Sequence, residues 1–260
     1  MTQIARFSTA EGPRYGLIAD GILYALAGPA DAPPFGRRDL APGERMGPVE
    51  QITLLPPVVP GKIMCIGRNY AAHAAEHGVS VPDEPVLFLK PPSALIAHGG
   101  QIVLPPGAGR VDHEAELAVI IGQRASHVRR EEALDYVFGY TSANDVSARD
   151  YQKKDGQWGR AKGFDTFCPL GPWIVTGLDV ADLAIACHVN GEQRQSARTS
   201  DMIFDVATLV SFVSGVMTLL PGDVLLTGTP SGVSPLLAGD TVEVMIEGIG
   251  TLRNTVRNAR

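Results

Sequence analysis

The sequence predicts a mostly β protein with a few helices, of the α+β class, made of one large domain and a small N-terminal domain. Hydrophobic residues make up 45% of the 260 residues and charged residues 19%, so the chain can bury a sizeable core. Many short runs, among them LAVIIG, DVLLTG and TVEVMIEG, have the composition of strands bounded by turns. Only three stretches carry a helical pattern.

The N-terminal part is expected to form a small β-rich domain over residues 1–57. Its start, RFSTAEGPRYGLIADGILYAL, is typical of short strands separated by Gly and Asp turns. The stretch from Gly28 to Pro48 is rich in Pro and Gly, as expected of a connection rather than packed structure. We place the boundary near Pro57 and expect residues 58–260 to form the larger domain.

The larger domain begins with a strand of buried character, KIMCIG, and contains a strong hairpin signal. Asn190-Gly191 lies within LAIACHVNGEQRQSA, and Asn-Gly is a preferred two-residue hairpin turn. We expect the last of the helices to be capped by Ser200 or Asp201 and ended by Pro221. The helical patterns cover Asn69–His77, Arg130–Val137 and Met202–Leu220.

Charge, targeting signals and cysteine content exclude several classes of protein. A net charge of -6 argues against a nucleic-acid partner. The start MTQIARFSTAEG resembles neither an export nor an import signal, so we expect the cytoplasm. The longest apolar stretch, Val206–Leu220, is shorter than the roughly 20 residues of a membrane span and predicts a core helix, with no membrane partner. Cys65, Cys168 and Cys187 are too few and scattered for disulfides or a zinc site, so we expect reduced, non-catalytic thiols.

The segment DHEAELAVIIG carries the first candidate metal ligands. If it is a strand, Glu114 and Glu116 project from the same face, with Ala115 opposite. Two carboxylates in one small space repel each other unless a proton or a cation intervenes. Hard oxygen ligands suit Mg²⁺, Mn²⁺ or Ca²⁺ rather than zinc. On spacing alone, a solvated strand face explains the pair equally well.

The segment GYTSANDVSARDYQ places Asp145 and Arg149 in a loop at the end of a predicted strand. Asp145 is a candidate third oxygen ligand. Arg149 and Lys162 are cations that can pair with a substrate carboxylate or a developing oxyanion near such a metal. Taken alone, these residues are better explained as ordinary surface charge.

The segment GRNYAAHAAEHG carries His73, Glu76 and His77 on a short Ala-rich helix, where residues three and four apart are neighbours. Three interpretations are open. The string HAAEH matches the zinc-peptidase pattern in which two histidines bind zinc and Glu acts as base. Alternatively, Glu76 orients His73 and raises its basicity, so that it takes a proton from water. The third interpretation is an ordinary polar helix end at the surface.

Seven segments, in this order, resemble the fumarylacetoacetate hydrolase family: KIMCIGRNYAAHAAEHG, PVLFLKPPSALI, HEAELAVIIG, GYTSANDVSARDYQ, WGRAKGFDTFCPLGPW, NGEQRQSARTS and MTLLPGDVLLTGTPSGV. The resemblance covers about the last four-fifths of the chain. It implies a mixed β-sheet roll as the catalytic fold over residues 58–260, usually as a homodimer. It also implies Mg²⁺ or Mn²⁺ held by a Glu-x-Glu pair and a later Asp, here Glu114, Glu116 and Asp145.

The same resemblance assigns the lid and shows two departures from the family pattern. His73 and Glu76 match a His-x-x-Glu pair on a lid helix that orders when substrate binds. This outweighs the zinc-peptidase interpretation, which leaves the other segments unexplained. Ser234 stands where the pattern GTPxGVG predicts glycine, and His113 replaces the more familiar aromatic residue before Glu114.

The function implied by the resemblance is hydrolysis of a carbon–carbon bond in an acylpyruvate-type 2-oxo acid through a metal-stabilised enolate. His73, oriented by Glu76, would activate water for attack on the distal carbonyl, and Lys162, the active-site lysine, would stabilise the oxyanion formed there. The residues expected to face the substrate are Arg149, Gln152 and Thr229.

Two alternatives use the same residues. Relatives in the homoprotocatechuate branch of aromatic catabolism isomerise 2-hydroxyhepta-2,4-diene-1,7-dioate or decarboxylate its precursor, and others decarboxylate oxaloacetate. A binding protein without catalysis is disfavoured, because the three carboxylates and the lysine are intact.

Overall fold

The computed structural model describes residues 1–29, 32–37, 40–76, 78 and 80–259. The large sheet contains β4 (Pro42–Pro48), β3 (Ile22–Leu26), β2 (Gly12–Ala19), β1 (Thr2–Thr9), β13 (Cys168–Thr176), β11 (Val137–Asn144), β10 (Ala115–Ile121), β16 (Val224–Leu226), β5 (Ile63–Gly67) and β6 (Val86–Lys90) in this spatial order, with β7 (Leu95–Ile96) beside β13. A second sheet contains β15 (Glu192–Arg198), β14 (Ala184–Val189), β17 (Thr241–Ile246), β18 (Gly250–Asn258) and β8 (Gln101–Leu104). β12 (Ser147–Ala148) pairs with β9 (Val111–Asp112).

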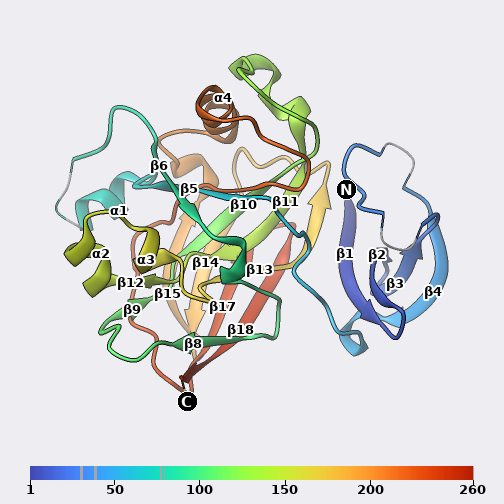
Figure 1. The fold of residues 1–260 in the computed structure, drawn as a ribbon, viewed down its shortest axis with the longest axis horizontal. Helices are drawn as coiled ribbons and strands as arrows, with labels where there is room; N and C mark the ends of the chain where they lie inside the picture. Colours follow the sequence, from blue (N-terminus) through green and yellow to red (C-terminus); the bar gives the residue numbers. More distant parts are fainter. Residues whose placement is uncertain (30–31, 38–39, 77, 79, 260) are drawn as a thin grey trace.

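The helices are few and short. The α-helices are α1 (Ala71–Glu76), α2 (Arg149–Asp155), α3 (Gly159–Lys162) and α4 (Val206–Val216). The 3₁₀ helices are η1 (Val49–Gln51), η2 (Pro92–Ala94), η3 (Arg130–Tyr136) and η4 (Thr199–Asp201). The predicted mostly β, α+β class is therefore confirmed, with antiparallel and parallel pairs in the same large sheet. Figure 1 shows β1–β4 on one side of the molecule and α1, α2 and α3 on the other.

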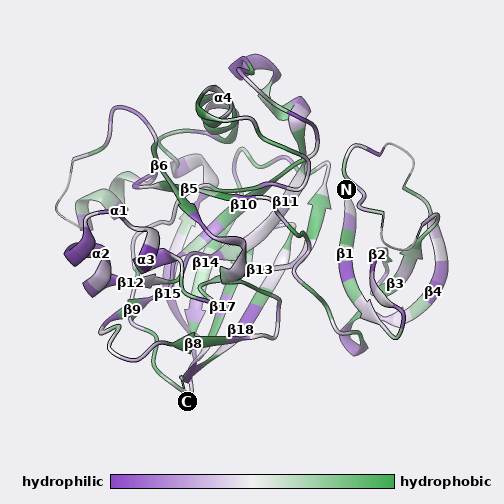
Figure 2. Ribbon diagram, in the orientation of Figure 1, coloured by the Kyte–Doolittle hydropathy of each residue, from purple (hydrophilic) through white to green (hydrophobic). Residues whose placement is uncertain are grey.

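Strand β10 lies at the centre of the core and is buried along its whole length. Leu117 and Val119 pack into the larger apolar cluster, together with residues of α4, whereas Ala118 and Ile120 pack into a second cluster. Because successive side chains of a strand point to opposite faces, Glu116 shares the face of Ala118 and Ile120. Figure 2 shows the contrast with α2 at the periphery, whose residues are mainly hydrophilic.

The helix predicted over Met202–Leu220 is shorter than expected. It begins at Val206, where the Asp205 carboxylate caps it by accepting a hydrogen bond from the backbone N–H of Thr208 at 2.8 Å. The predicted caps were wrong because Asn69, distant in sequence, binds the backbone of residues 203 and 204 and holds them out of the helix. At the other end, Leu219 bonds with Ala125, and this bridge replaces a last helical turn.

The stretch Gly28–Pro48 was expected to be a connection, but its last seven residues form β4. This strand pairs with β3 at the edge of the large sheet. Its prolines, Pro42 and Pro48, lie at its two ends, and an edge strand tolerates proline because one of its sides needs no hydrogen-bonded partner. Tertiary pairing here outweighs the Pro- and Gly-rich composition.

The other local predictions differ in outcome. Asn190-Gly191 joins β14 to β15, and both residues have the positive φ of a type I′ turn, which confirms the hairpin. The Arg130–Val137 pattern forms a 3₁₀ helix rather than an α-helix. Of the Asn69–His77 pattern, Ala71–Glu76 is helical, and His77 lies outside the described residues. In the described part of the chain, no helix is both long and apolar enough to cross a membrane.

Candidate functional site

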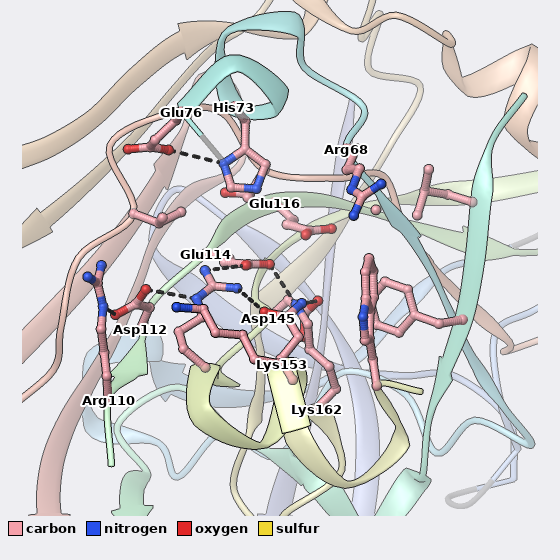
Figure 3. A pocket seen from close by; sticks show the side chains of 18 residues that line it. Arg68, His73, Glu76, Arg110, Asp112, Glu114, Glu116, Asp145, Lys153 and Lys162 are labelled. Carbon is pink, nitrogen blue, oxygen red and sulfur yellow. Dashed lines mark hydrogen bonds and ion pairs between the residues drawn. The ribbon is translucent and has the colours of Figure 1, made fainter. Parts of the chain in front are cut away.

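A cavity of about 580 Å³ opens between α1, α2, α3 and the carboxyl-rich end of β10. Every site residue predicted from the sequence lines it. Figure 3 shows α1 on one side of the cavity and the carboxylates on the other, with the His73 ring projecting between them. The predicted residues that meet here are His73, Glu76, Glu114, Glu116, Asp145, Arg149, Gln152, Lys162 and Thr229.

Three carboxylates converge at the wall formed by β10 and β11. Glu114 precedes β10, Glu116 lies within it, and Asp145 follows β11 directly. The two strands are antiparallel, and the backbone N–H of Asp145 donates to the carbonyl of Glu114 at 2.9 Å, so the strand pairing brings these positions together. One carboxylate oxygen from each residue lies within 4.8 Å of the others, and all three side chains are buried.

Two buried lysines neutralise part of this negative charge. Lys162 Nζ donates to Glu114 at 2.8 Å and to Asp145 at 2.6 Å. Lys90 Nζ, at the end of β6, donates to the other Asp145 oxygen at 2.6 Å. Burial alone would lower the pKa of Lys162, but the Asp145 and Glu114 carboxylates outweigh burial and raise that pKa. Lys162 is therefore charged at neutral pH.

Glu116 differs from its two neighbours. Among the described residues it has no ion pair, and its carboxylate accepts only the backbone N–H of Gly228, at 2.7 Å. Burial, together with repulsion from Asp145 and Glu114, raises the pKa of Glu116 well above its usual range. By contrast, burial would raise the pKa of Glu114, but Lys162 and Arg149 lower it below its usual range.

The donor set fits a hard divalent cation. It offers three carboxylate oxygens in close range, and one carboxylate, Glu116, lacks a counter-ion among the described residues. Buried carboxylates without compensation are costly, and a bound cation removes that cost. Oxygen-only ligands of this kind suit Mg²⁺, Mn²⁺ or Ca²⁺ rather than zinc. The buried acidic triad is the only such group found in the described part of the chain.

Arg149 begins α2 and is bound on three sides. Its Nε donates to Asp112 at 2.8 Å, and its Nη2 lies 2.6 Å from Glu114. Its Nη1 donates to Gln152 at 2.9 Å. Arg149 and Gln152 therefore line the cavity as a linked pair, and Arg149 also contacts a predicted metal ligand. Arg110 extends this chain of charges toward the rim through its bond to Asp112 at 2.7 Å.

His73 and Glu76 lie on α1, above the carboxylates. His73 Nδ1 is 3.2 Å from Glu76 Oε2, and the imidazole is largely buried. The backbone N–H of Gly232 donates to Glu76 Oε1 at 3.1 Å, which ties α1 to the loop after β16. Figure 3 shows Glu76 on the side of the His73 ring away from the carboxylates. The zinc-peptidase interpretation also requires His77, which lies outside the described residues.

Sequence reasoning missed three buried residues that complete the site: Lys90, Asp112 and Gln195. Lys90 carried a usable signal, because a lysine that ends the apolar run VLFL must be paired if the run is buried. Asp112 was within the quoted segment DHEAE, but nothing local indicated its partner Arg149. Gln195 lies 80 residues from its partner Ala115, so its contacts arise only in the folded chain.

The chain is similar to proteins that are named as a tautomerase, an isomerase and a hydrolase. It is 45% identical over 232 residues to the mitochondrial oxaloacetate tautomerase Fahd2a of Rattus norvegicus, covering 85% of this chain and 74% of the relative. A 2-hydroxyhepta-2,4-diene-1,7-dioate isomerase from Mycobacterium marinum has a similar structure, with a TM-score of 0.90, 44% identity and 99% coverage of each chain. The maleylpyruvate hydrolase of Sphingobium sp. SYK-6, in complex with manganese(II) ion and pyruvate, superposes with a TM-score of 0.83 at 35% identity, over 99% of this chain and all of that chain.

Family models match nearly the whole chain. Residues 2–57 match the Rv2993c-like N-terminal family, and residues 62–257 match the fumarylacetoacetate (FAA) hydrolase C-terminal family. The second match carries the carboxylates, both lysines and the His73–Glu76 pair. The chain belongs to the fumarylacetoacetate hydrolase family of enzymes.

Proposed function

We propose that this enzyme hydrolyses a carbon–carbon bond in an acylpyruvate-type 2-oxo acid and requires Mg²⁺ or Mn²⁺. The observation that carries the proposal is the His73–Glu76 pair facing a buried carboxylate triad across one cavity. A base opposite a cation site suits a reaction in which water is deprotonated at one end of the substrate while negative charge develops at the other.

Glu114, Glu116 and Asp145 would hold the metal, which when bound supplies the positive charge that stabilises a substrate enolate. Glu76 orients the His73 ring, so that His73 can accept a proton from water. Gly232 in turn keeps Glu76 in place through its backbone N–H.

Lys162 has a second role in this proposal. Its ammonium is engaged by Glu114 and Asp145 at 2.8 and 2.6 Å. With a divalent cation held by those carboxylates, Lys162 would be available to stabilise an oxyanion at the distal carbonyl of the substrate. Lys90 remains on Asp145 and maintains the position of that ligand.

The positive charge at the rim of the cavity favours an acidic substrate. Arg68, Arg110 and Lys153 line it outside the carboxylate triad, and Figure 3 shows all three around the space in front of the triad. Positive side chains at a cavity mouth attract anions and pair with carboxylates. A substrate with a carboxylate at its far end would meet one of these side chains.

Isomerisation or tautomerisation, or decarboxylation of a 2-oxo acid such as oxaloacetate, is the second candidate. Relatives that are 45% and 44% identical are named as a tautomerase and an isomerase. The His73–Glu76 pair can also move a proton between carbon atoms of a metal-stabilised enolate, which requires no water. The two candidates therefore differ in the fate of the His73 proton, not in the metal site.

One assay separates the candidates. Metal-stripped protein, supplied with Mg²⁺ or Mn²⁺, is incubated with acetylpyruvate, fumarylpyruvate, oxaloacetate or 2-hydroxyhepta-2,4-diene-1,7-dioate, and the products are identified by NMR. Hydrolysis gives pyruvate and a second acid, decarboxylation gives carbon dioxide, and isomerisation gives neither. Absence of metal-dependent turnover of all four compounds would overturn the proposal. The homodimer expected from the sequence stays a prediction, which light scattering can test.

A further inference from the structure

Gln195 lies on β15 and does not itself line the substrate cavity, yet it is buried and contacts both the segment of the carboxylates, at Ala115, and the loop that carries Thr229. Its Oε1 accepts the backbone N–H of Ala115 at 2.9 Å and lies 3.1 Å from His113 Nδ1. Its Nε2 donates to the Thr229 hydroxyl and to the carbonyl of Pro230, each at 2.8 Å.

The backbone partners determine which end of the amide is oxygen. The Ala115 N–H can only donate, so the atom facing it must be the amide oxygen. The Pro230 carbonyl can only accept, so the atom facing it must be the amide nitrogen. A flipped Gln195 would lose both bonds, and buried polar groups without partners are costly.

This orientation fixes the roles of the two side chains that Gln195 contacts. Thr229 Oγ1 faces an NH₂ group and must accept there, so its own proton points to another acceptor. Thr229 lines the cavity, where a substrate carboxylate would supply that acceptor. His113 Nδ1 faces an oxygen and must carry a proton. The other ring nitrogen is 2.8 Å from the Ser234 hydroxyl, so the two residues that depart from the family pattern are partners of each other.

The loop of residues 227–234 connects this network to the rest of the site. Its Gly228 N–H binds Glu116, and its Gly232 N–H binds Glu76. Gly232 has a φ of +96°, and a Cβ there would lie 2.0 Å from the carbonyl oxygen of Arg194. The loop therefore packs directly on the backbone of β15, beside Gln195.

We propose that Gln195 is a positioning residue, which holds the 227–234 loop against the strand of Glu114 and Glu116 and makes the Thr229 hydroxyl a donor to the substrate carboxylate. The inference rests on the proposed function, because it assumes a 2-oxo acid in the cavity. It assigns Gln195 no contact with substrate, so its effect on substrate binding must pass through the 227–234 loop, which carries Thr229.

The test measures binding of pyruvate to the Mg²⁺-loaded full-length protein by calorimetry. Thr229→Val removes the donor and should weaken binding roughly tenfold to a hundredfold, as expected when a hydrogen bond to a charged group is lost. Thr229→Ser keeps the hydroxyl and should bind within about threefold of wild type. Gln195→Glu keeps the acceptor but loses the donor, so the Thr229 proton turns toward residue 195 and binding weakens.

A double-mutant cycle separates an effect through the Thr229 hydroxyl from direct repulsion between the new carboxylate at position 195 and pyruvate. When Thr229 is already Val, Gln195→Glu should change pyruvate binding by less than about threefold. If the new carboxylate acted by repulsion, Gln195→Glu would weaken binding as much in this protein as in the wild type. Gln193→Glu is the matched control, since it adds the same charge to an exposed position of the same strand and should leave binding unchanged.

A second measurement uses the wild-type protein and therefore tests the inference even if the Gln195 variant does not fold. The ¹⁵N shifts of His113 in the wild-type protein should show a proton on Nδ1, and a proton on Nε2 alone would overturn the inferred orientation. Unchanged pyruvate binding in Thr229→Val would overturn the inference about Gln195 but not the proposed function. The same holds if Gln195→Glu weakens pyruvate binding as much in the Thr229→Val protein as in the wild type. Failure of the Mg²⁺-loaded wild type to bind pyruvate would overturn the proposed function as well.

Discussion

The N-terminal strands and the rest of the chain bury different chemistry. In β1–β4 the buried side chains of the described residues are apolar, among them Ile4, Phe7 and Leu23. Beyond residue 68 the core also holds charged side chains, and several of these line one cavity: Asp112, Glu114, Glu116, Asp145, Arg149 and Lys162. Burying charge is costly, so it is retained where compensating partners or a ligand are available. The comparison indicates that β1–β4 support the fold, whereas the charged side chains that the structure places around the cavity come from the larger part.

Loss of the metal should have the largest effect. Asp145→Asn removes a ligand and the carboxylate bound by both lysines, and we expect turnover to fall at least about 10³-fold, as for loss of several kcal/mol of charge stabilisation. Chelation of the wild type should have the same effect, reversed by added Mg²⁺ or Mn²⁺. Asp165→Asn, at an exposed position, is the matched control. Full activity after chelation would contradict the metal site.

His73→Ala should lower turnover roughly 10²- to 10⁴-fold, the usual contribution of general acid–base catalysis, without weakening Mn²⁺ binding. Glu76→Gln should give a smaller loss in the same direction, because it keeps the shape but not the charge beside the imidazole. Glu84→Gln, an exposed change of the same type, should have no effect. Steady-state kinetics and Mn²⁺ calorimetry provide the two readouts. Unaltered turnover in His73→Ala would exclude it as the base.

Leu23→Ala tests the other half of the comparison. This side chain is fully buried in the small apolar cluster of β1–β4, and its truncation should cost about 2–5 kcal/mol of unfolding free energy. Turnover per folded molecule should not change, since no residue of β1–β4 lines the active cavity. Denaturant unfolding measures the first quantity and kinetics at low temperature the second. Leu237→Ala, at a 66% exposed position, is the control. A fall in kcat per folded molecule in Leu23→Ala but not in Leu237→Ala would contradict the contrast between β1–β4 and the rest of the chain.

The smallest expected effect concerns Glu116 in the metal-free protein. Its raised pKa means that the folded state binds a proton more tightly than the unfolded chain. The contribution of this proton to folding stability is fully present below the pKa of Glu116 in the unfolded chain, about 4.3. It is lost as the pH rises through the pKa of Glu116 in the folded protein. Glu116→Gln should therefore raise the melting temperature in EDTA at neutral pH by roughly 2–4 °C, the shift that ~1 kcal/mol produces.

Thermal unfolding against pH, with and without Mg²⁺, tests this last expectation. Added Mg²⁺ should stabilise the wild type but not Glu116→Gln, which has lost a ligand. If metal-free Glu116→Gln were less stable than the metal-free wild type at neutral pH, the negative charge of Glu116 would have to be balanced without metal. The larger part of the chain would then differ less from β1–β4 in the cost of its buried groups.

Local pattern anticipated much of the fold and the site. Alternation along DHEAELAVIIG predicted two carboxylates on one face, and Asn190-Gly191 predicted a turn, because both depend on neighbours in the chain. Local pattern failed where a distant partner intervened. Asn69 shortens the helix expected at Met202, and pairing with β3 makes a strand of Pro42–Pro48.

The sequence by itself determined the chemistry available to this protein: a Glu-x-Glu strand, a His-x-x-Glu helix and the cations beside them. Only the tertiary structure decided which charges are compensated. Lys90 meets Asp145 across 55 residues, and Gln195 meets Ala115 across 80, whereas Glu116 is left with a backbone N–H as its hydrogen-bond donor. Such pairings depend on strand order and register in space, and side-chain periodicity carries no information about either.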